Sequence, residues 1–306
     1  MPPDTAPRIR PLWGRLVLAL VLFVMLPGML SVLVYSFTYV VRNLDPENPG
    51  AMSQPDEEEL KRLVEEPGLR LVTIFIQVLV GFVLTVGLTW FVDRRPLGSL
   101  GFAVRNPKPA AVGWGAFLGI ILSAVIVLTI AALGGRHVRF EGFTGHPGWW
   151  VGPVVVLLVG AAFVEEWFLR GYVYVNFREQ IPAARAILLT ALLFTAVHLN
   201  TPGGGVLGWI NVFLVGIVLG QLRELTGGLH VPVGLHAGWN LTLGMVLGAE
   251  LSGMTLPSLF RVSFQDLDTA LGGGEFGPEG SLVTTVLLGG LTVLLARRLA
   301  PPPREI

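Results

Sequence analysis

Glu165 and Glu166 are adjacent carboxylates inside the apolar run 151–174, and Arg170 follows four residues after the second of them. A charged side chain at bilayer depth costs about 2.5–3.5 kcal/mol or more, so an acidic pair placed there indicates a function. Because neighbouring helical residues point about 100° apart, the two carboxylates must face different partners. A carboxylate shielded from water can act as a general base, which is the chemistry that this pair first suggests.

Two further polar pairs follow in equally apolar surroundings, Phe194 with His198 and His236 with Asn240. Each pair is spaced four residues apart, which places both members on one face of a helix. An imidazole can accept a proton, and imidazole and amide groups can donate hydrogen bonds to an oxyanion. Together with the acidic pair, these groups are the parts from which a hydrolase can be built.

Sequence spacing also suggests that the titratable groups share one depth. Each of Glu165, His198 and His236 lies 13 residues from an arginine expected on the cytoplasmic side, namely Arg178, Arg185 and Arg223. At 1.5 Å per residue, this separation corresponds to up to about 20 Å of helix. The three groups can therefore meet, although their helices run in alternating directions.

Glu166 and Arg170 have the order and spacing of a favourable ion pair within a helix. We expect them to form a buried structural pair, in which loss of one partner would leave an uncompensated charge. Glu165 would then be left to face His198. Other polar residues of the apolar stretches are expected to bridge helices through hydrogen bonds; these are Gln77, Asn211 and Gln221.

The composition is that of an integral membrane protein. Of the 306 residues, 52% are hydrophobic and 14% are charged, whereas soluble domains average about 25% charged residues. The absence of cysteine excludes disulfides, thiolate zinc sites and cysteine nucleophiles.

The expected fold is all-α, a polytopic membrane helix bundle with about eight transmembrane helices, because a helix needs about 20 apolar residues to cross a bilayer. The apolar stretches lie at 12–37, 70–92, 111–133, 150–176, 184–200, 206–222, 229–249 and 281–299. We interpret residues 1–306 as one membrane domain, with a catalytic core at 150–250.

Charge is distributed unevenly among the segments that would connect these helices. The segments expected in the cytoplasm carry arginines, among them Arg94, Arg95, Arg178, Arg223, Arg297 and Arg298. The outer segments 43–69 and 253–280 are rich in Asp and Glu, as the positive-inside rule allows. We therefore expect a multi-pass protein of the cell (inner) membrane with both termini in the cytoplasm. Both acidic segments are expected to be solvated and without a catalytic role.

The three motifs together are more specific than any one of them. Glu165-Glu166-x-x-x-Arg170, Phe194-x-x-x-His198 and His236-x-x-x-Asn240, in this order on successive helices, resemble the signature motifs of the CPBP family of intramembrane proteases. That family contains CAAX-protease and bacteriocin-processing proteins of the Rce1/Abi type. The stretch 94–102 also resembles an amphipathic segment that is common in the family.

The resemblance implies a glutamate-dependent intramembrane endopeptidase of eight helices whose site opens toward the cytoplasm. By similarity, Glu165 is the general base and His198 its partner, and together they activate a water. His236 and Asn240 would then donate hydrogen bonds to the tetrahedral oxyanion. The partners expected are the lipid bilayer and a membrane-associated protein or peptide substrate, with no nucleic acid. Whether the reaction is CAAX processing, bacteriocin maturation or bacteriocin immunity stays open.

Two other classes of function use the same residues. A zinc metalloendopeptidase could hold its metal with Glu165, His198 and His236, which form a known type of catalytic zinc set. We favour a site without a cofactor, because an asparagine on the same face as His236 suits an oxyanion donor better than a zinc ligand. A non-enzymatic membrane transporter or scaffold is the remaining alternative, since membrane Glu and His residues also form proton relays.

Overall fold

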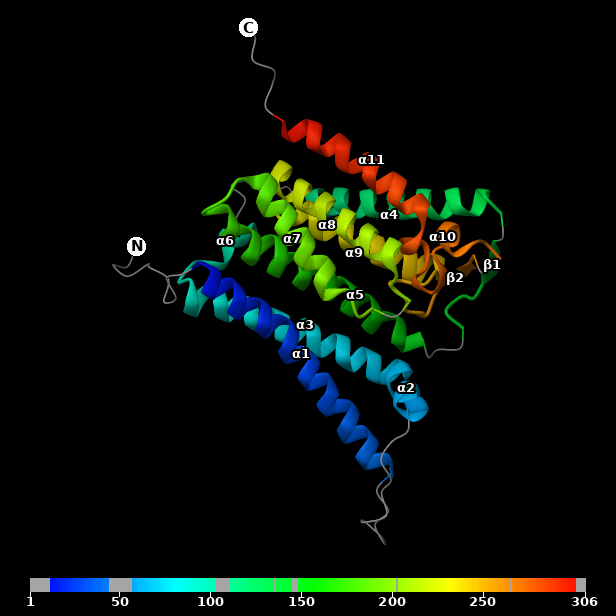
Figure 1. Ribbon diagram of the computed structural model, residues 1–306. Helices are drawn as coiled ribbons and strands as arrows, with labels where there is room; N and C mark the ends of the chain where they lie inside the picture. Colours follow the sequence, from blue (N-terminus) through cyan, green and yellow to red (C-terminus); the bar gives the residue numbers. More distant parts are fainter. Residues whose placement is uncertain are drawn as a thin grey trace. The chain divides into compact units, whose positions relative to one another are not determined.

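The computed structural model describes residues 12–43, 57–102, 110–134, 136–144, 148–201, 203–264 and 266–300. Most of this part of the chain is helical and very little of it is strand (Figure 1), so the expected all-α class is confirmed. Within it, six helices are long and apolar enough to cross a membrane, at Leu12–Asn43, Gly68–Val92, Ala110–Ala132, Gly148–Arg178, Val206–Thr226 and Leu282–Leu299. The other two expected spans match shorter helices, and the count of eight stays a prediction.

Contacts divide the chain into two compact units, Met1–Arg94 and Arg95–Ile306. The first unit consists of α1 (Leu12–Asn43), α2 (Glu57–Glu65), α3 (Pro67–Gly87) and the π-helix η2 (Leu88–Val92). Two ion pairs connect its helices. Arg15 Nη1 lies 3.0 Å from Asp93 Oδ1 in a buried setting, and Arg42 binds both carboxylate oxygens of Glu66 at 2.6 and 2.9 Å.

The second unit holds every residue of the three motifs. Its elements are η3 (Leu97–Leu100), α4 (Ala110–Ala132), β1 (His137–Phe140), η4 (Gly148–Trp150), α5 (Val151–Glu166), η5 (Trp167–Val173), α6 (Tyr174–Arg178), α7 (Ala183–Val197), α8 (Val206–Thr226), α9 (His230–Asn240), η6 (Leu241–Leu247), β2 (Phe260–Ser263), α10 (Thr269–Gly272), η7 (Gly274–Phe276), η8 (Pro278–Gly280) and α11 (Leu282–Leu299). The two short strands pair antiparallel, with His137 opposite Ser263.

Glycines bring α4 and α9 into backbone contact. Gly115 and Gly119 on α4, and Gly234 and Gly238 on α9, each follow the small-xxx-small spacing of closely packed membrane helices. A Cβ added at Gly119 would lie 2.2 Å from the carbonyl oxygen of Leu235, and one at Gly234, Gly115 or Gly238 would meet backbone oxygen at 2.2–2.4 Å. Because side chains two residues apart point to opposite sides of a helix, His236 faces away from this contact.

The segment 253–280 differs from the solvated loop that we expected. It contains β2, α10 and two 3-10 turns, and it buries apolar side chains; Phe276 is 1% exposed. The buried ring fills the space beside Gly208 on α8, where an added Cβ would lie 3.0 Å from it. The segment is therefore part of the folded second unit. Of the other acidic segment, residues 44–56 lie outside the described residues.

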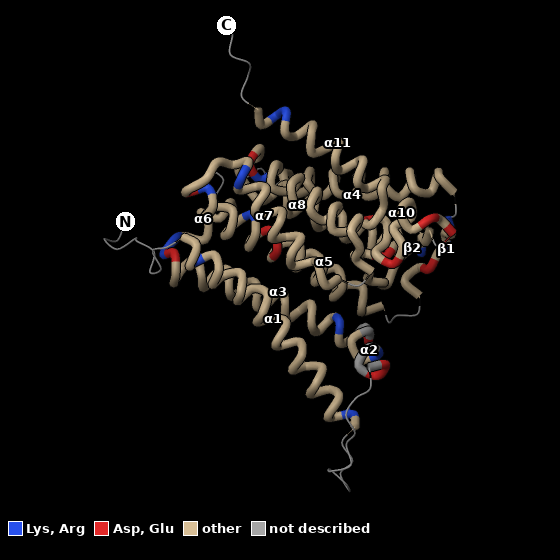
Figure 2. Tube along the Cα trace, viewed as in Figure 1, with Lys and Arg blue, Asp and Glu red and all other residues tan. Residues whose placement is uncertain are grey.

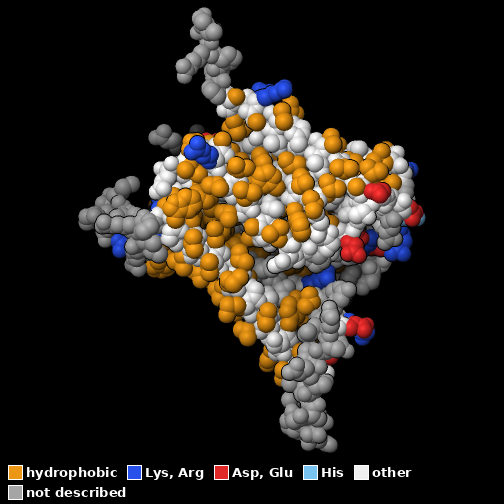
Figure 3. Space-filling model, viewed as in Figure 1, with side chains coloured by type: hydrophobic (Ala, Val, Ile, Leu, Met, Phe, Trp, Pro, Cys, Tyr) orange, Lys and Arg blue, Asp and Glu red, His pale blue; other side chains and the backbone are white. Residues whose placement is uncertain are grey.

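The distribution of side chains suits a lipid environment. Charged residues lie mostly toward helix ends and around β1 and β2 (Figure 2), and hydrophobic side chains cover much of the visible helical surface (Figure 3). Large apolar side chains such as Trp114, Leu128 and Val286 are 64%, 68% and 71% exposed. Surfaces of this kind are covered by lipid in a membrane protein, which agrees with the membrane localisation expected from composition.

Candidate active site

Glu165 and Glu166 are the last two residues of α5, and Arg170 lies in the π-helix η5 that follows. π-Helical turns occur frequently at functional sites. The expected ion pair is present, with Arg170 Nη1 2.8 Å from Glu166 Oε1 and neither side chain exposed. Arg170 Nη2 also donates to the carbonyl of Gly216 on α8 at 3.2 Å. The pair thus joins two helices of the bundle.

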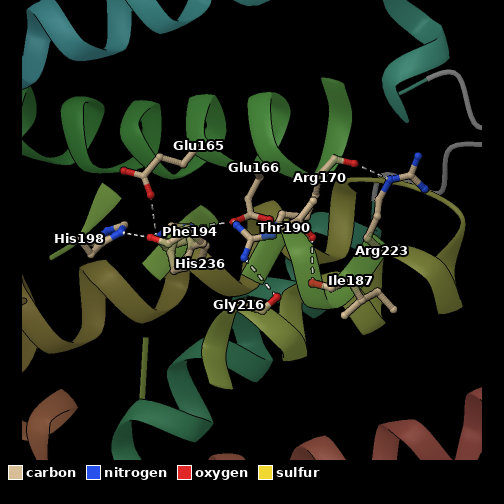
Figure 4. A network of polar contacts seen from close by, with 10 residues as sticks. All are labelled: Glu165, Glu166, Arg170, Ile187, Thr190, Phe194, His198, Gly216, Arg223 and His236. Carbon is tan, nitrogen blue, oxygen red and sulfur yellow. Dashed lines mark hydrogen bonds and ion pairs between the residues drawn. The ribbon is translucent and has the colours of Figure 1, made fainter. Parts of the chain in front are cut away.

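His236 lies beside both carboxylates (Figure 4). Its Nδ1 is 3.1 Å from Glu166 Oε1, and its Nε2 is 4.0 Å from Glu165 Oε2. Because a carboxylate accepts hydrogen bonds, the Nδ1 proton points to Glu166 and the Nε2 edge turns to Glu165. Glu166 therefore binds both Arg170 and His236, whereas its spacing predicted Arg170 as its main partner.

His198 takes a different position from the one we expected. It is the C-cap residue of α7, and its Nδ1 lies 2.7 Å from the carbonyl oxygen of Phe194. A carbonyl can only accept, so Nδ1 carries the proton and Nε2 of the neutral ring presents a lone pair. No direct contact joins His198 to Glu165 among the described residues; the imidazole within ion-pair distance of Glu165 is that of His236.

Phe194 is surrounded by three polar groups of the site. The Arg170 guanidinium lies over its ring, 4.4 Å from the centroid. The His198 ring is 4.5 Å away, and the His236 ring packs edge-on at 6.0 Å. Cation–π and edge-to-face contacts of this kind fix orientation as well as adding stability. The sequence named Phe194 as a motif member without a role, and the structure places it at the centre of the cluster.

Several polar atoms of the site are buried without a hydrogen-bond partner in the described part of the chain. They are Oε2 of Glu165, Oε2 of Glu166 and Nε of Arg170. Leaving such an atom unsatisfied costs about 1–3 kcal/mol, so each requires an explanation. The Glu165 side chain is 28% exposed and that of Glu166 is 0% exposed, so a substrate or water can reach Glu165 more easily.

Asn240 completes the third motif. It ends α9, one helical turn after His236, and η6 begins at the next residue. The side chain is half-buried, and no hydrogen bond occupies it within the described ranges. An amide in this position has donors available for a bound substrate.

Across the described residues, no group of three or more His, Cys, Asp or Glu side chains is arranged to hold a metal ion. Glu165 and His236 approach each other, but catalytic zinc in the alternative considered above needs three converging protein ligands.

The residues of this site lie within a segment that matches a known protein family. No curated protein matches the chain significantly. A family described as Rce1-like, type II CAAX prenyl endopeptidase Rce1-like, matches residues 147–242. The matched region contains all three motifs, from the acidic pair at the end of α5 to Asn240 at the end of α9. The resemblance of the three motifs to the CAAX-protease family is therefore confirmed.

Proposed function

We propose that this protein is an intramembrane endopeptidase that uses Glu165 as a general base to hydrolyse a peptide bond in a membrane-associated protein or peptide. The Rce1-like match supports the broad class of CAAX-type endopeptidase. The observation that carries the assignment of the base is the buried Oε2 of Glu165, which accepts no hydrogen bond from the described residues and lies 4.0 Å from Nε2 of His236. A carboxylate oxygen in this setting can take a proton from water.

In the proposed reaction, Glu165 and Nε2 of His198 both accept hydrogen bonds from one water molecule. The water oxygen attacks the carbonyl carbon of the scissile bond as Glu165 takes its proton. The bond to nitrogen then breaks, and Glu165 returns the proton to the departing amine. The carbonyl of Phe194 supports this role for His198, because it fixes the tautomer with an unprotonated Nε2.

His236 and Asn240 would stabilise the oxyanion formed during attack. As an imidazolium, His236 donates Nδ1–H to Glu166 and keeps Nε2–H for the substrate oxygen. The amide of Asn240 supplies a second donor from the same helix face. Donors that are already oriented in a water-poor site are worth about 3–4 kcal/mol each in transition-state stabilisation. Glu166 thus orients an oxyanion donor in addition to pairing with Arg170.

The test compares Glu165→Gln with Glu275→Gln in purified, detergent-solubilised protein, using a membrane-associated peptide reporter with a quenched fluorophore. Glu275 is exposed in η7 of the same unit and serves as the matched control. We expect Glu165→Gln to remain monodisperse and to lose nearly all cleavage, while Glu275→Gln keeps it. Cleavage by Glu165→Gln at the unmodified rate would overturn the proposal.

A further inference from the structure

Glu279, in the segment 253–280, accepts hydrogen bonds on both carboxylate oxygens. Its Oε1 accepts from the indole Nε1–H of Trp239 at 2.8 Å. Its Oε2 accepts from the backbone N–H of Ser252 at 2.6 Å and from the Ser252 hydroxyl at 2.9 Å. Hydrogen bonds to an ionised carboxylate are shorter and stronger than neutral ones. The carboxylate of Glu279 therefore connects η8 to Trp239 in α9 and to Ser252 in the turn after η6.

Trp239, the residue of α9 that donates to Glu279, directly precedes Asn240. Trp239 is 4% exposed, and a buried indole N–H requires an acceptor. Asn240 is the last residue of α9 and the N-cap of the π-helix η6. The indole bond thus acts at the junction where α-helical hydrogen bonding changes to the wider π pattern.

Glu279 is itself anchored to the helices around it. Its backbone carbonyl accepts from Asn211 Nδ2 on α8 at 2.7 Å, and Asn211 Oδ1 accepts from Thr285 on α11 at 2.7 Å. Ser252 has a φ of 47°, a conformation that is unfavourable for a residue with a side chain and that persists only when its surroundings hold it. The carboxylate of Glu279 thus combines a bond to α9 with two bonds that hold this strained turn.

We propose that Glu279 is a positioning residue for the peptidase reaction, which sets the orientation of Asn240 by fixing Trp239 at the junction of α9 and η6; this assignment rests on the proposed function. A shift of one residue in the hydrogen-bond pattern there would turn Asn240 by about 100° around the helix axis. The glycine face of α9 fixes its distance from α4. Glu279 adds a directional bond at the end of the helix, which glycine packing does not provide.

Two substitutions break the bond from either side. Trp239→Phe keeps an aromatic ring and removes the donor. Glu279→Gln keeps the shape but replaces one acceptor oxygen with an NH₂ group, so Trp239 and Ser252 can no longer both be satisfied. Glu275→Gln, on an exposed carboxylate of the same segment, is the matched control.

We expect each of the two variants to lower kcat by about 10- to 100-fold with little change in KM, because small misplacements of a catalytic group have effects of this size. In an Asn240→Ala background, Glu279→Gln should cause little further loss, since the two residues act through one group. Hydrogen exchange in Leu241–Leu247 should rise in both variants and stay unchanged in Glu275→Gln.

An unchanged kcat, a full additional loss in the Asn240→Ala background, or unchanged exchange in η6 would each overturn the assignment. The proposed function fails on a different result, namely cleavage by Glu165→Gln. In that case the exchange measurement still decides whether Glu279 orders the α9–η6 junction. Unfolding of Glu279→Gln would leave the decision to Trp239→Phe, which removes one hydrogen bond and part of the ring and keeps both bonds from Ser252 to Glu279.

Discussion

The glycine contact between α4 and α9 predicts that Gly→Ala substitutions there lower the stability of the protein, although helix propensity alone would raise it. In a helix interior, Gly→Ala normally stabilises by about 0.8–1.0 kcal/mol. At Gly119 the new Cβ would lie 2.2 Å from the carbonyl oxygen of Leu235, whereas real Cβ contacts are essentially never closer than 3.0 Å. The neighbouring atom belongs to the backbone, so relief requires movement of a whole helix by about 0.8 Å.

We expect Gly119→Ala to destabilise the protein by about 1–3 kcal/mol, the usual cost of overpacking a tight interior. Activity should fall further than stability, by up to about 10²-fold in kcat, because α9 carries His236 and Asn240 and a shift near 1 Å can cost that much. Thermal unfolding in detergent and steady-state cleavage measure the two effects. Gly234→Ala, on the facing helix, should behave in the same way.

Gly113→Ala supplies the control within the same helix. An added Cβ there meets nothing within 4 Å, so propensity alone should operate and the protein should be unchanged or slightly stabilised. If Gly119→Ala and Gly113→Ala gave the same unfolding temperature and the same kcat, the close contact would carry no energetic weight and the reasoning would be refuted.

Four further outcomes are expected. Glu166→Gln should lower the yield of monodisperse protein, because breaking a buried ion pair costs about 3–5 kcal/mol; a normal yield would contradict this. Asn240→Ala should reduce kcat by about 10²–10³ with little change in KM, and a mainly KM effect would reassign it to substrate binding. The chain lacks cysteine, so single cysteines at Glu275 and Arg297 can be labelled in intact cells; an impermeant reagent should reach only the first if the C-terminus is cytoplasmic. Metal analysis of active protein should find substoichiometric zinc and full activity after chelation, whereas one zinc per chain with reversible loss of activity would support the metalloprotease alternative.

Much of the architecture could be predicted from the sequence because apolar length and i,i+4 spacing have direct structural meaning. The expected stretch 111–133 became α4 at Ala110–Ala132, and 206–222 became α8 at Val206–Thr226. The spacing of Glu166 and Arg170 predicted their ion pair. In each of these cases the signal lies within one helix, where local geometry decides the outcome.

Contacts between helices were harder to predict. We expected Glu165 to face His198, yet the imidazole nearest to it is that of His236. One physical cause accounts for the difference: α7 ends just before His198, whose ring turns back to a carbonyl of its own helix. The end of a helix next to a motif residue is decided by such a local contact, which i,i+4 spacing does not show.

The role of 253–280 was missed because its composition is polar and rich in glycine, which usually indicates a solvated loop. The segment folds through a few specific groups, such as the buried ring of Phe276 and the carboxylate of Glu279. Single anchoring residues of this kind leave no periodic pattern. Glu279 lies 40 positions from Trp239 in the sequence, and only the folded chain shows that the two are hydrogen-bonded.

The hydrogen bonds of the buried pair also constrain when the site can exist during synthesis. Arg170 reaches Gly216 across 46 positions of the chain, and Glu166 reaches His236 across 70. While the ribosome has made only the helices up to α7, these partners do not yet exist. A nascent chain in the membrane therefore lacks both hydrogen bonds of the buried pair until α9 has been inserted and packed.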